Sequence, residues 1–161
     1  MTQQQQASII TDQMRAAIGK ESPSVTYEID NTGCRQFARA AGYTDPLFYD
    51  EAHARSKGYR GLLAPSGFLG HPLISPGQPP RMPGGAGGLD IPLKRVLNGG
   101  TDVEYFDDVC AGDVLTATNK LAHISEREGR MGQMLILSTE TTYRNQAGDT
   151  VAVMRGTTIR Y

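Results

Sequence analysis

The chain has 161 residues, about the length of one globular domain. Its 16 Lys and Arg and 17 Asp and Glu give a net charge of −1, which excludes the strong positive field of a nucleic-acid-binding protein. Hydrophobic residues make up 39% of the chain, enough for a packed core and too many for a wholly disordered protein. We therefore expect one domain over residues 1–161. A loop over residues 71–92 interrupts it, because eleven of those 22 residues are Gly or Pro.

The two cysteines, Cys34 and Cys110, are isolated from each other and from histidine at metal-ligand spacing. Such cysteines are more often buried small hydrophobes than disulfide partners, and we expect no metal and no cofactor. The N-terminal residues lack the basic and apolar regions of a signal peptide, and no apolar run approaches the ~20 residues of a membrane span. The sequence thus predicts a cytoplasmic protein without membrane contact.

The first half of the chain is expected to be mainly helical. Polar capping residues precede its apolar helical patterns, and glycines follow several of them. The expected elements are a helix over residues 12–18 capped by Thr11, a strand over 24–29, a helix from its cap Asn31 to Gly42, a helix from its cap Asp50 to Lys57, and a helix beginning near Pro65.

The second half is expected to be a β-sheet. Four stretches rich in Val, Thr, Ile, Leu and Tyr are separated by short turn sequences such as residues 145–148. Short connections favour an antiparallel meander, so the fold class is α+β, with the sheet wrapped around the helix that follows residue 31. Dimerisation would cover the remaining sheet edge. The expected strands are residues 101–106, 113–123, 133–143 and 150–161.

The motifs of several common sites are absent or out of context. The glycine run over residues 84–88 follows no predicted strand and precedes no Lys-Ser/Thr pair, so it is interpreted as part of a surface loop or cover and not as a phosphate site. No GxSxG, HExxH or CxxC motif occurs, which excludes the corresponding hydrolases, zinc proteases and redox proteins. His71 lies just before the Pro/Gly loop, but the sequence identifies no carboxylate partner for it.

Two neighbouring segments are the most informative. Residues 37–50 read FARAAGYTDPLFYD, and residues 61–67 read GLLAPSG. Together with VCAGD at 109–113 and GDTV at 148–151, they resemble the MaoC-like hydratases and dehydratases, and more narrowly the FAS1-like, or MaoC N-terminal, dehydratase domain. The resemblance covers residues 27–161 and implies a hot-dog fold, an antiparallel sheet around a central helix.

The active members of that family carry Asp-x-Asn-Pro-x-His-x-Asp in the first segment. The resemblance places Pro46 at the proline, Asp45 at the asparagine and Asp50 at the final aspartate. Tyr43 then stands at the catalytic Asp and Phe48 at the catalytic His. Neither side chain is a general base at neutral pH, because phenylalanine does not ionise and tyrosine titrates near ~10.

The resemblance therefore implies a subunit of a heteromeric enoyl-CoA hydratase, equivalently a 3-hydroxyacyl-CoA dehydratase. The chain would shape the acyl tunnel, while a partner with an intact Asp-x-Asn-Pro-x-His motif performs the chemistry in a heterodimer or heterotetramer. No catalytic residue is assigned to this chain, and its substrate is an acyl thioester of CoA or of an acyl carrier. The implied substrate-binding residues are Asp45, Pro46, Phe48, Ala64, Pro65, Ser66, Gly67, Phe68, Leu69 and His71.

Three alternatives stay open. The chain is a hydratase by itself if Asp45, Asp50 or His71 forms a rearranged site, or it is a non-catalytic module that binds acyl thioesters. The resemblance to hot-dog proteins also leaves a thioesterase open, although no Asp or Glu is clearly placed as its nucleophile or base on the central helix. Arg60 and Arg81 flank the pocket segments and are candidates for contact with the CoA phosphates, although solvated surface arginines are commoner.

Overall fold

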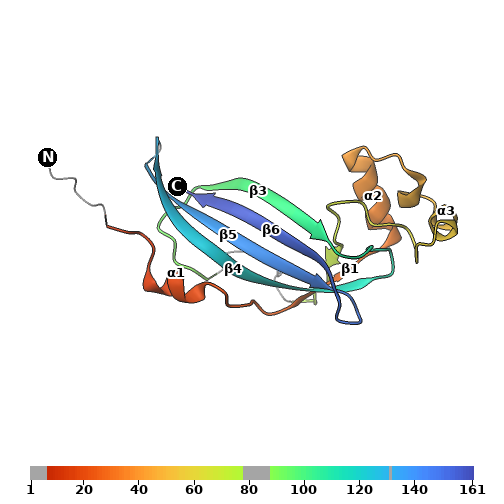
Figure 1. The fold of residues 1–161 in the computed structure, drawn as a ribbon, viewed down its shortest axis with the longest axis horizontal. Coiled ribbons are helices and arrows are strands. Elements are labelled where there is room, and N and C mark those ends of the chain that lie inside the picture. The colour runs from red at the N-terminus through yellow and green to blue at the C-terminus, as the bar shows by residue number, and fades with distance from the viewer. Residues whose placement is uncertain (1–6, 78–87, 131) are drawn as a thin grey trace.

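The computed structural model describes residues 7–77, 88–130 and 132–161. Within these residues, six strands form one antiparallel sheet in the order β2-β1-β4-β5-β6-β3, with short helices beside it, so the fold class is α+β (Figure 1). The described ranges contain no helix long and apolar enough to cross a membrane. The elements are α1 (Asp12–Ala17), β1 (Val25–Glu28), α2 (Asn31–Ala41), the 3-10 helix η1 (Pro46–Phe48), α3 (Glu51–Ser56), β2 (His71–Pro72), β3 (Val96–Tyr105), β4 (Val114–Gly129), β5 (Gly132–Arg144) and β6 (Thr150–Arg160).

The expected antiparallel meander is confirmed by β4, β5 and β6, which pair in sequence order. Asn145 shapes the β5–β6 turn, because its side-chain oxygen accepts the N–H groups of Ala147 and Asp149 at 3.0 and 2.9 Å. Two strands are longer than the sequence indicated. β4 continues to Gly129, and β3 begins at Val96 and pairs with β6 across a bulge beside Gly100.

The helix caps agree with the sequence analysis at two helices and differ at one. The Thr11 hydroxyl accepts the Met14 N–H at 3.2 Å, and the Asp50 carboxylate accepts the His53 N–H at 3.0 Å. The cap of α2 is Asp30, and the prediction of Asn31 was wrong by one residue. Asp30 keeps the extended backbone of the preceding strand and accepts the Gly33 N–H at 2.8 Å, so Asn31 becomes the first helical residue.

The prediction of a helix near Pro65 is wrong. The Phe68 N–H donates to the Pro65 carbonyl at 2.9 Å, which closes a single turn. Gly67 and Gly70 then have φ of +93° and +90°, a left-handed conformation that cannot continue a right-handed helix. The segment instead leads into the short strand β2.

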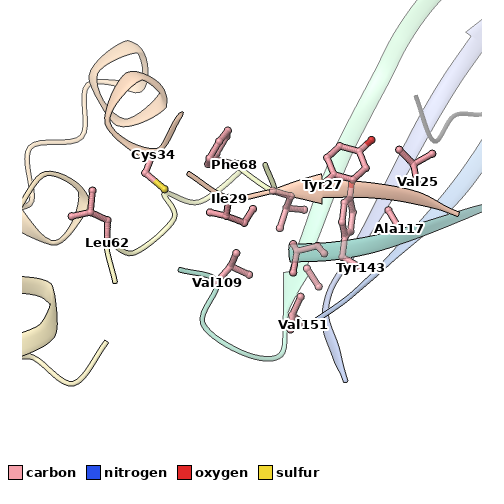
Figure 2. Packing of buried hydrophobic residues seen from close by; sticks show 13 residues of the cluster. Val25, Tyr27, Ile29, Cys34, Leu62, Phe68, Val109, Ala117, Tyr143 and Val151 are labelled. Atoms are coloured by element: carbon pink, nitrogen blue, oxygen red, sulfur yellow. The ribbon is translucent and has the colours of Figure 1, made fainter. Parts of the chain in front are cut away.

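Two clusters of buried side chains hold the molecule together. The first joins α2, β1, the 62–69 segment and the adjoining ends of β4, β5 and β6; Figure 2 shows Cys34 and Leu62 on one side of it and Tyr27 and Tyr143 on the other. The second lies on the sheet beside α1. Its members are Met14, Leu121, Ile124, Leu135 and Leu137, with Leu89, Ile91 and Leu93 packed against them.

Both cysteines are free and buried, as the sequence analysis expected. Cys34 and Cys110 have no exposed surface. Burial, and to a smaller extent the charge of Asp30, raises the pKa of the Cys34 thiol to about 12. These thiols therefore serve as packing groups.

Candidate functional site

The loop between α2 and α3 uses its two carboxylates to cap helices. Asp45 accepts the Leu47 N–H at 2.9 Å and begins η1, where Pro46 takes a first-turn position that needs no N–H. Asp50 caps α3 in the same way. Both carboxylates hold the local backbone in place.

The side chains at the two expected dyad positions pack against each other. The Tyr43 and Phe48 ring centroids lie 5.6 Å apart with a 38° tilt, within the range of attractive aromatic pairs. The Tyr49 hydroxyl donates to the Tyr43 carbonyl at 2.6 Å and closes the loop around this pair. An apolar contact thus occupies the place where the resemblance puts an acid and a base.

Phe48 lines a cavity of about 230 Å³, called the Phe48 cavity below. Two backbone hydrogen bonds position its wall: the Leu63 N–H donates to the Leu47 carbonyl at 3.1 Å, and the Ala64 N–H donates to the Val109 carbonyl at 2.8 Å. Apolar side chains provide much of the wall, and two carboxylates and two hydroxyls add polar groups. The lining residues are Phe48, Leu63, Ala64, Ser66, Tyr105, Asp107, Asp108 and Val109.

A tyrosine from β3 ties the cavity to the sheet. The Gly67 N–H donates to the Tyr105 hydroxyl oxygen at 2.8 Å. Tyr105 also lines the cavity and stays 37% exposed. It connects the turn after Pro65 to the end of the outermost strand.

The structure brings only some of the expected binding residues together. Phe48, Ala64 and Ser66 line the cavity, Asp45 and Pro46 form the turn that carries Phe48, and Gly67 reaches Tyr105. Pro65, Phe68 and Leu69 instead have side chains buried in the protein interior. That difference reflects the missing helix at Pro65.

His71 lies apart from the Phe48 cavity. It is exposed on β2, and its ring meets the edge of the Phe68 ring at a centroid distance of 5.2 Å. A Cβ atom on Gly33 would lie 2.9 Å from His71 Nε2 and 3.1 Å from Asp30 Oδ2, so the histidine flanks the start of α2. It is not among the residues that line the cavity beside Phe48.

Five of the lining residues were not predicted from the sequence. Tyr105, Asp107, Asp108 and Val109 follow Phe48 by more than 50 residues, and Leu63 was not among the candidates. The pair Asp107-Asp108 lies just after the end of β3 and lines the cavity together with Phe48 of η1. No local motif indicates this closeness, because it depends on the tertiary fold.

The sequence analysis interprets the glycine run of the Pro/Gly loop as part of a surface loop or cover. None of the described residues of that loop lines the Phe48 cavity. Gly88 and Leu89 line another cavity of about 270 Å³, beside Ala17 and Lys120. Residues 78–87, which include Arg81 and most of the glycine run, lie outside the described residues.

Arg60 is engaged within the protein. It donates to Asp113 at 2.8 Å and to the Asp108 carbonyl at 3.0 Å. These bonds fix the turn before β4. Across the described residues, no cluster of three His, Cys, Asp or Glu side chains could hold a metal ion.

Comparison with known families identifies the domain type. A family model described as FAS1-like, dehydratase domain region, matches residues 16–154. The chain belongs to this family. Similar curated proteins include a UPF0336 protein of Parafrankia sp., 34% identical over 140 residues, covering 83% of this chain and 87% of that one. A UPF0336 protein of Thermobifida fusca is 32% identical over 118 residues, covering 71% and 72%.

A probable enoyl-CoA hydratase alpha subunit of Thermomonospora curvata is 25% identical over 142 residues, and the match covers 79% of this chain but only 43% of that protein. Solved structures give the fold. The HadBC (3R-hydroxyacyl-ACP dehydratase) complex of Mycobacterium tuberculosis matches with a TM-score of 0.68 at 22% identity, covering 89% of this chain and 96% of that chain. The ChsH1-ChsH2 complex of the same organism also gives 0.68, at 16% identity and 92% coverage of both chains. The dehydratase domain therefore has the MaoC-like hot-dog fold.

Proposed function

We propose that this dehydratase domain is the non-catalytic subunit of a heteromeric enoyl-CoA hydratase, equivalently a 3-hydroxyacyl-CoA dehydratase. The observation that carries the proposal is the contact between Tyr43 and Phe48 at both positions where active relatives are expected to hold the acid and the base. Phe48 has no ionisable group, so this pair cannot activate a water molecule. The chain then contributes binding and shape, and a partner contributes the chemistry.

The geometry gives less support to a self-sufficient rearranged site. Asp45 and Asp50 each accept a backbone N–H at a helix start, and their protonation would weaken those caps. His71 is exposed on β2 and outside the cavity. None of these three side chains lines the Phe48 cavity, whereas acid–base catalysis needs the titratable group beside the substrate.

The Phe48 cavity suits the acyl part of a substrate. Phe48, Leu63, Ala64 and Val109 offer apolar surface, and Ser66 and Tyr105 add hydroxyls. Apolar walls with a few polar groups are typical of pockets for such ligands. In this proposal the cavity forms one wall of the acyl tunnel.

The free edge of the sheet supports a partner subunit. Among residues 7–77, 88–130 and 132–161, β3 has β6 on one side and no strand on the other. Its ten residues are exposed except for Val103, and Leu97 is 50% exposed. Because the cavity lies at the end of this same strand, a second hot-dog chain pairing with β3 would also close the cavity. Two of the structures with this fold, HadBC and ChsH1-ChsH2, are complexes by name.

The test is an assay of trans-2-enoyl-CoA hydration by the purified chain, by a candidate partner carrying Asp-x-Asn-Pro-x-His, and by the two together. The proposal expects activity from the complex and none from this chain alone. Full activity of the isolated chain would contradict it. Tight binding of enoyl-CoA with no gain of activity on mixing would favour a binding module instead.

A variant in the cavity tests the role assigned to it. In the complex, Phe48→Trp narrows the space, so we expect kcat/KM to fall several-fold for a C12 enoyl-CoA and to change little for crotonyl-CoA. Tyr161→Trp, at the opposite end of the β3–β6 pair, is the matched control. An equal loss of kcat/KM for both substrates would contradict the proposal that the cavity lines the acyl tunnel.

A further inference from the structure

The Tyr105 hydroxyl accepts a hydrogen bond within the protein but donates none to a described residue. Its oxygen accepts the Gly67 N–H at 2.8 Å, and no described residue accepts its own proton. A tyrosine hydroxyl can donate and accept at once. The remaining donor therefore belongs to a side chain that lines the Phe48 cavity and is 37% exposed.

The bond from Gly67 also makes this hydroxyl a better donor. Accepting a hydrogen bond polarises an O–H group, so the bond that it donates is strengthened. The ring position is fixed as well, because Tyr105 pairs with Ala152 of β6 at one end and reaches the Pro65–Phe68 turn at the other. A hydrogen-bond donor fixed in an apolar wall orients a ligand by binding one of its polar atoms.

The rim of the cavity restricts what that atom can be. Asp107 and Asp108 line the same space, and the Asp107 carboxylate accepts the Asp108 N–H at 2.8 Å. Two carboxylates at one rim disfavour an anionic oxygen by charge repulsion. A neutral carbonyl oxygen has the required acceptor and avoids that repulsion.

We propose that Tyr105 donates a hydrogen bond to a carbonyl oxygen of the ligand in the Phe48 cavity, through the relay Gly67 N–H, Tyr105 O–H and carbonyl oxygen. The choice of an acyl ligand rests on the proposed function; the carbonyl site itself rests on the contacts of Tyr105. Two sources present this chemistry: the thioester carbonyl and a keto group further along the acyl chain. Tyr105 is then a specificity-determining residue of this subunit.

The first experiment uses the full chain alone and two probes of nearly equal shape. Cyclohexanone carries a carbonyl oxygen, and methylenecyclohexane carries a CH₂ group in its place. Dissociation constants are measured by NMR titration, following the amide signals of Gly67 and Ser66. In Tyr105→Phe we expect the affinity for cyclohexanone to fall about tenfold, because the buried carbonyl oxygen is left without a hydrogen-bond donor. The affinity for methylenecyclohexane stays within about twofold.

The controls separate this role from a structural one. If Tyr105 only tethers the turn, Tyr105→Phe weakens both probes equally, and that result overturns the proposal. Failure of the wild-type chain to bind cyclohexanone also overturns it. Tyr161→Phe removes a hydroxyl at the far end of β6 and should leave both affinities unchanged.

A second pair of measurements assigns the source of the carbonyl. Octenoyl-CoA is compared with its S-octenyl thioether, and 9-oxo-2-decenoyl-CoA with 2-decenoyl-CoA. If Tyr105→Phe abolishes the affinity difference between octenoyl-CoA and its thioether, the hydrogen-bonded atom is the thioester oxygen. If it abolishes the difference between 9-oxo-2-decenoyl-CoA and 2-decenoyl-CoA, that atom is the keto oxygen. If the substitution changes neither difference, the proposal for acyl ligands is overturned. None of these binding measurements needs catalysis. The carbonyl site at Tyr105 can therefore be disproved while the hydratase assay supports the proposed function, and the hydratase assay can fail while the carbonyl site is confirmed.

Discussion

The two edges of the sheet differ sharply. β2 is two residues long, contains Pro72 and pairs with β1, whereas β3 runs for ten residues without a proline and is exposed for most of its length. A short edge with proline resists the addition of another strand, and a long edge with free N–H and C=O groups invites it. The two edges of one sheet are thus built for different neighbours: solvent at β2 and, in our proposal, a second subunit at β3.

One glycine at each edge shows how differently the two edges are packed. Substituting these glycines gives the largest change in stability that we predict. A Cβ on Gly70, just before β2, would lie 2.6 Å from the Glu28 carbonyl oxygen, and φ is +90°. Gly100 in β3 also has a positive φ, +141°, but nothing lies within 4 Å of its Cβ position. We expect Gly70→Ala to lower the free energy of unfolding by about 3 kcal/mol or more, and Gly100→Ala by about 1 kcal/mol. Urea denaturation measures both, and equal losses would show that the two edges are packed alike.

The second prediction concerns association. Leu97 on β3 and Ile74 after β2 are 50% and 56% exposed, which makes them a matched pair of apolar residues at opposite edges. Leu97→Lys should weaken binding to the catalytic partner about tenfold, because it places a charge in the proposed contact. Ile74→Lys should leave binding unchanged. Sedimentation velocity of the mixed subunits measures this, and a loss with Ile74→Lys alone would move the interface to the β2 edge.

The smallest effect is expected in the ion-pair ladder that reaches β3. Glu140 on β5 accepts from Lys120 at 2.8 Å and from Arg155 at 3.2 Å, and Arg155 pairs with Glu104 of β3 at 2.9 Å. The hydrogen bond from Lys120 is the main cause that lowers the pKa of Glu140 below its usual 4.5. Glu140→Gln should reduce stability by about 0.5 kcal/mol at neutral pH, since the pairs are partly exposed.

The pH dependence of that effect has a definite sign. A lowered pKa in the folded state means that the ionised carboxylate stabilises the fold above pH 4.5, and this contribution is lost as the pH falls through the lower folded value. The stability difference between wild type and Glu140→Gln should therefore shrink in acid, as urea denaturation across pH would measure. High salt should shrink it as well, by screening. If the stability difference between wild type and Glu140→Gln does not change with pH, its cause is packing and not charge.

Some features of this site could be predicted locally, and others could not. The caps at Thr11 and Asp50 followed from residue type, because a cap depends on neighbours within three residues. The helix expected at Pro65 failed, because two glycines with positive φ redirect the chain there. Tyr105 and Asp107 were missed at the cavity, because their distance from Phe48 in the sequence hides their closeness in the fold.

The fold class could be predicted from periodicity and turn chemistry, which are local properties of the chain. The resemblance to a hot-dog family, and with it the proposal that Tyr43 and Phe48 stand at the dyad positions, came from residue identity in a few short motifs. Three other features follow from the tertiary fold alone: Tyr43 packs on Phe48, the Gly67 N–H donates to Tyr105, and β3 is an edge strand of the described sheet. Those facts depend on strand order and register, which place residues distant in the chain side by side. Residue identity specifies the groups that are available, and the packing of the sheet specifies which of them meet.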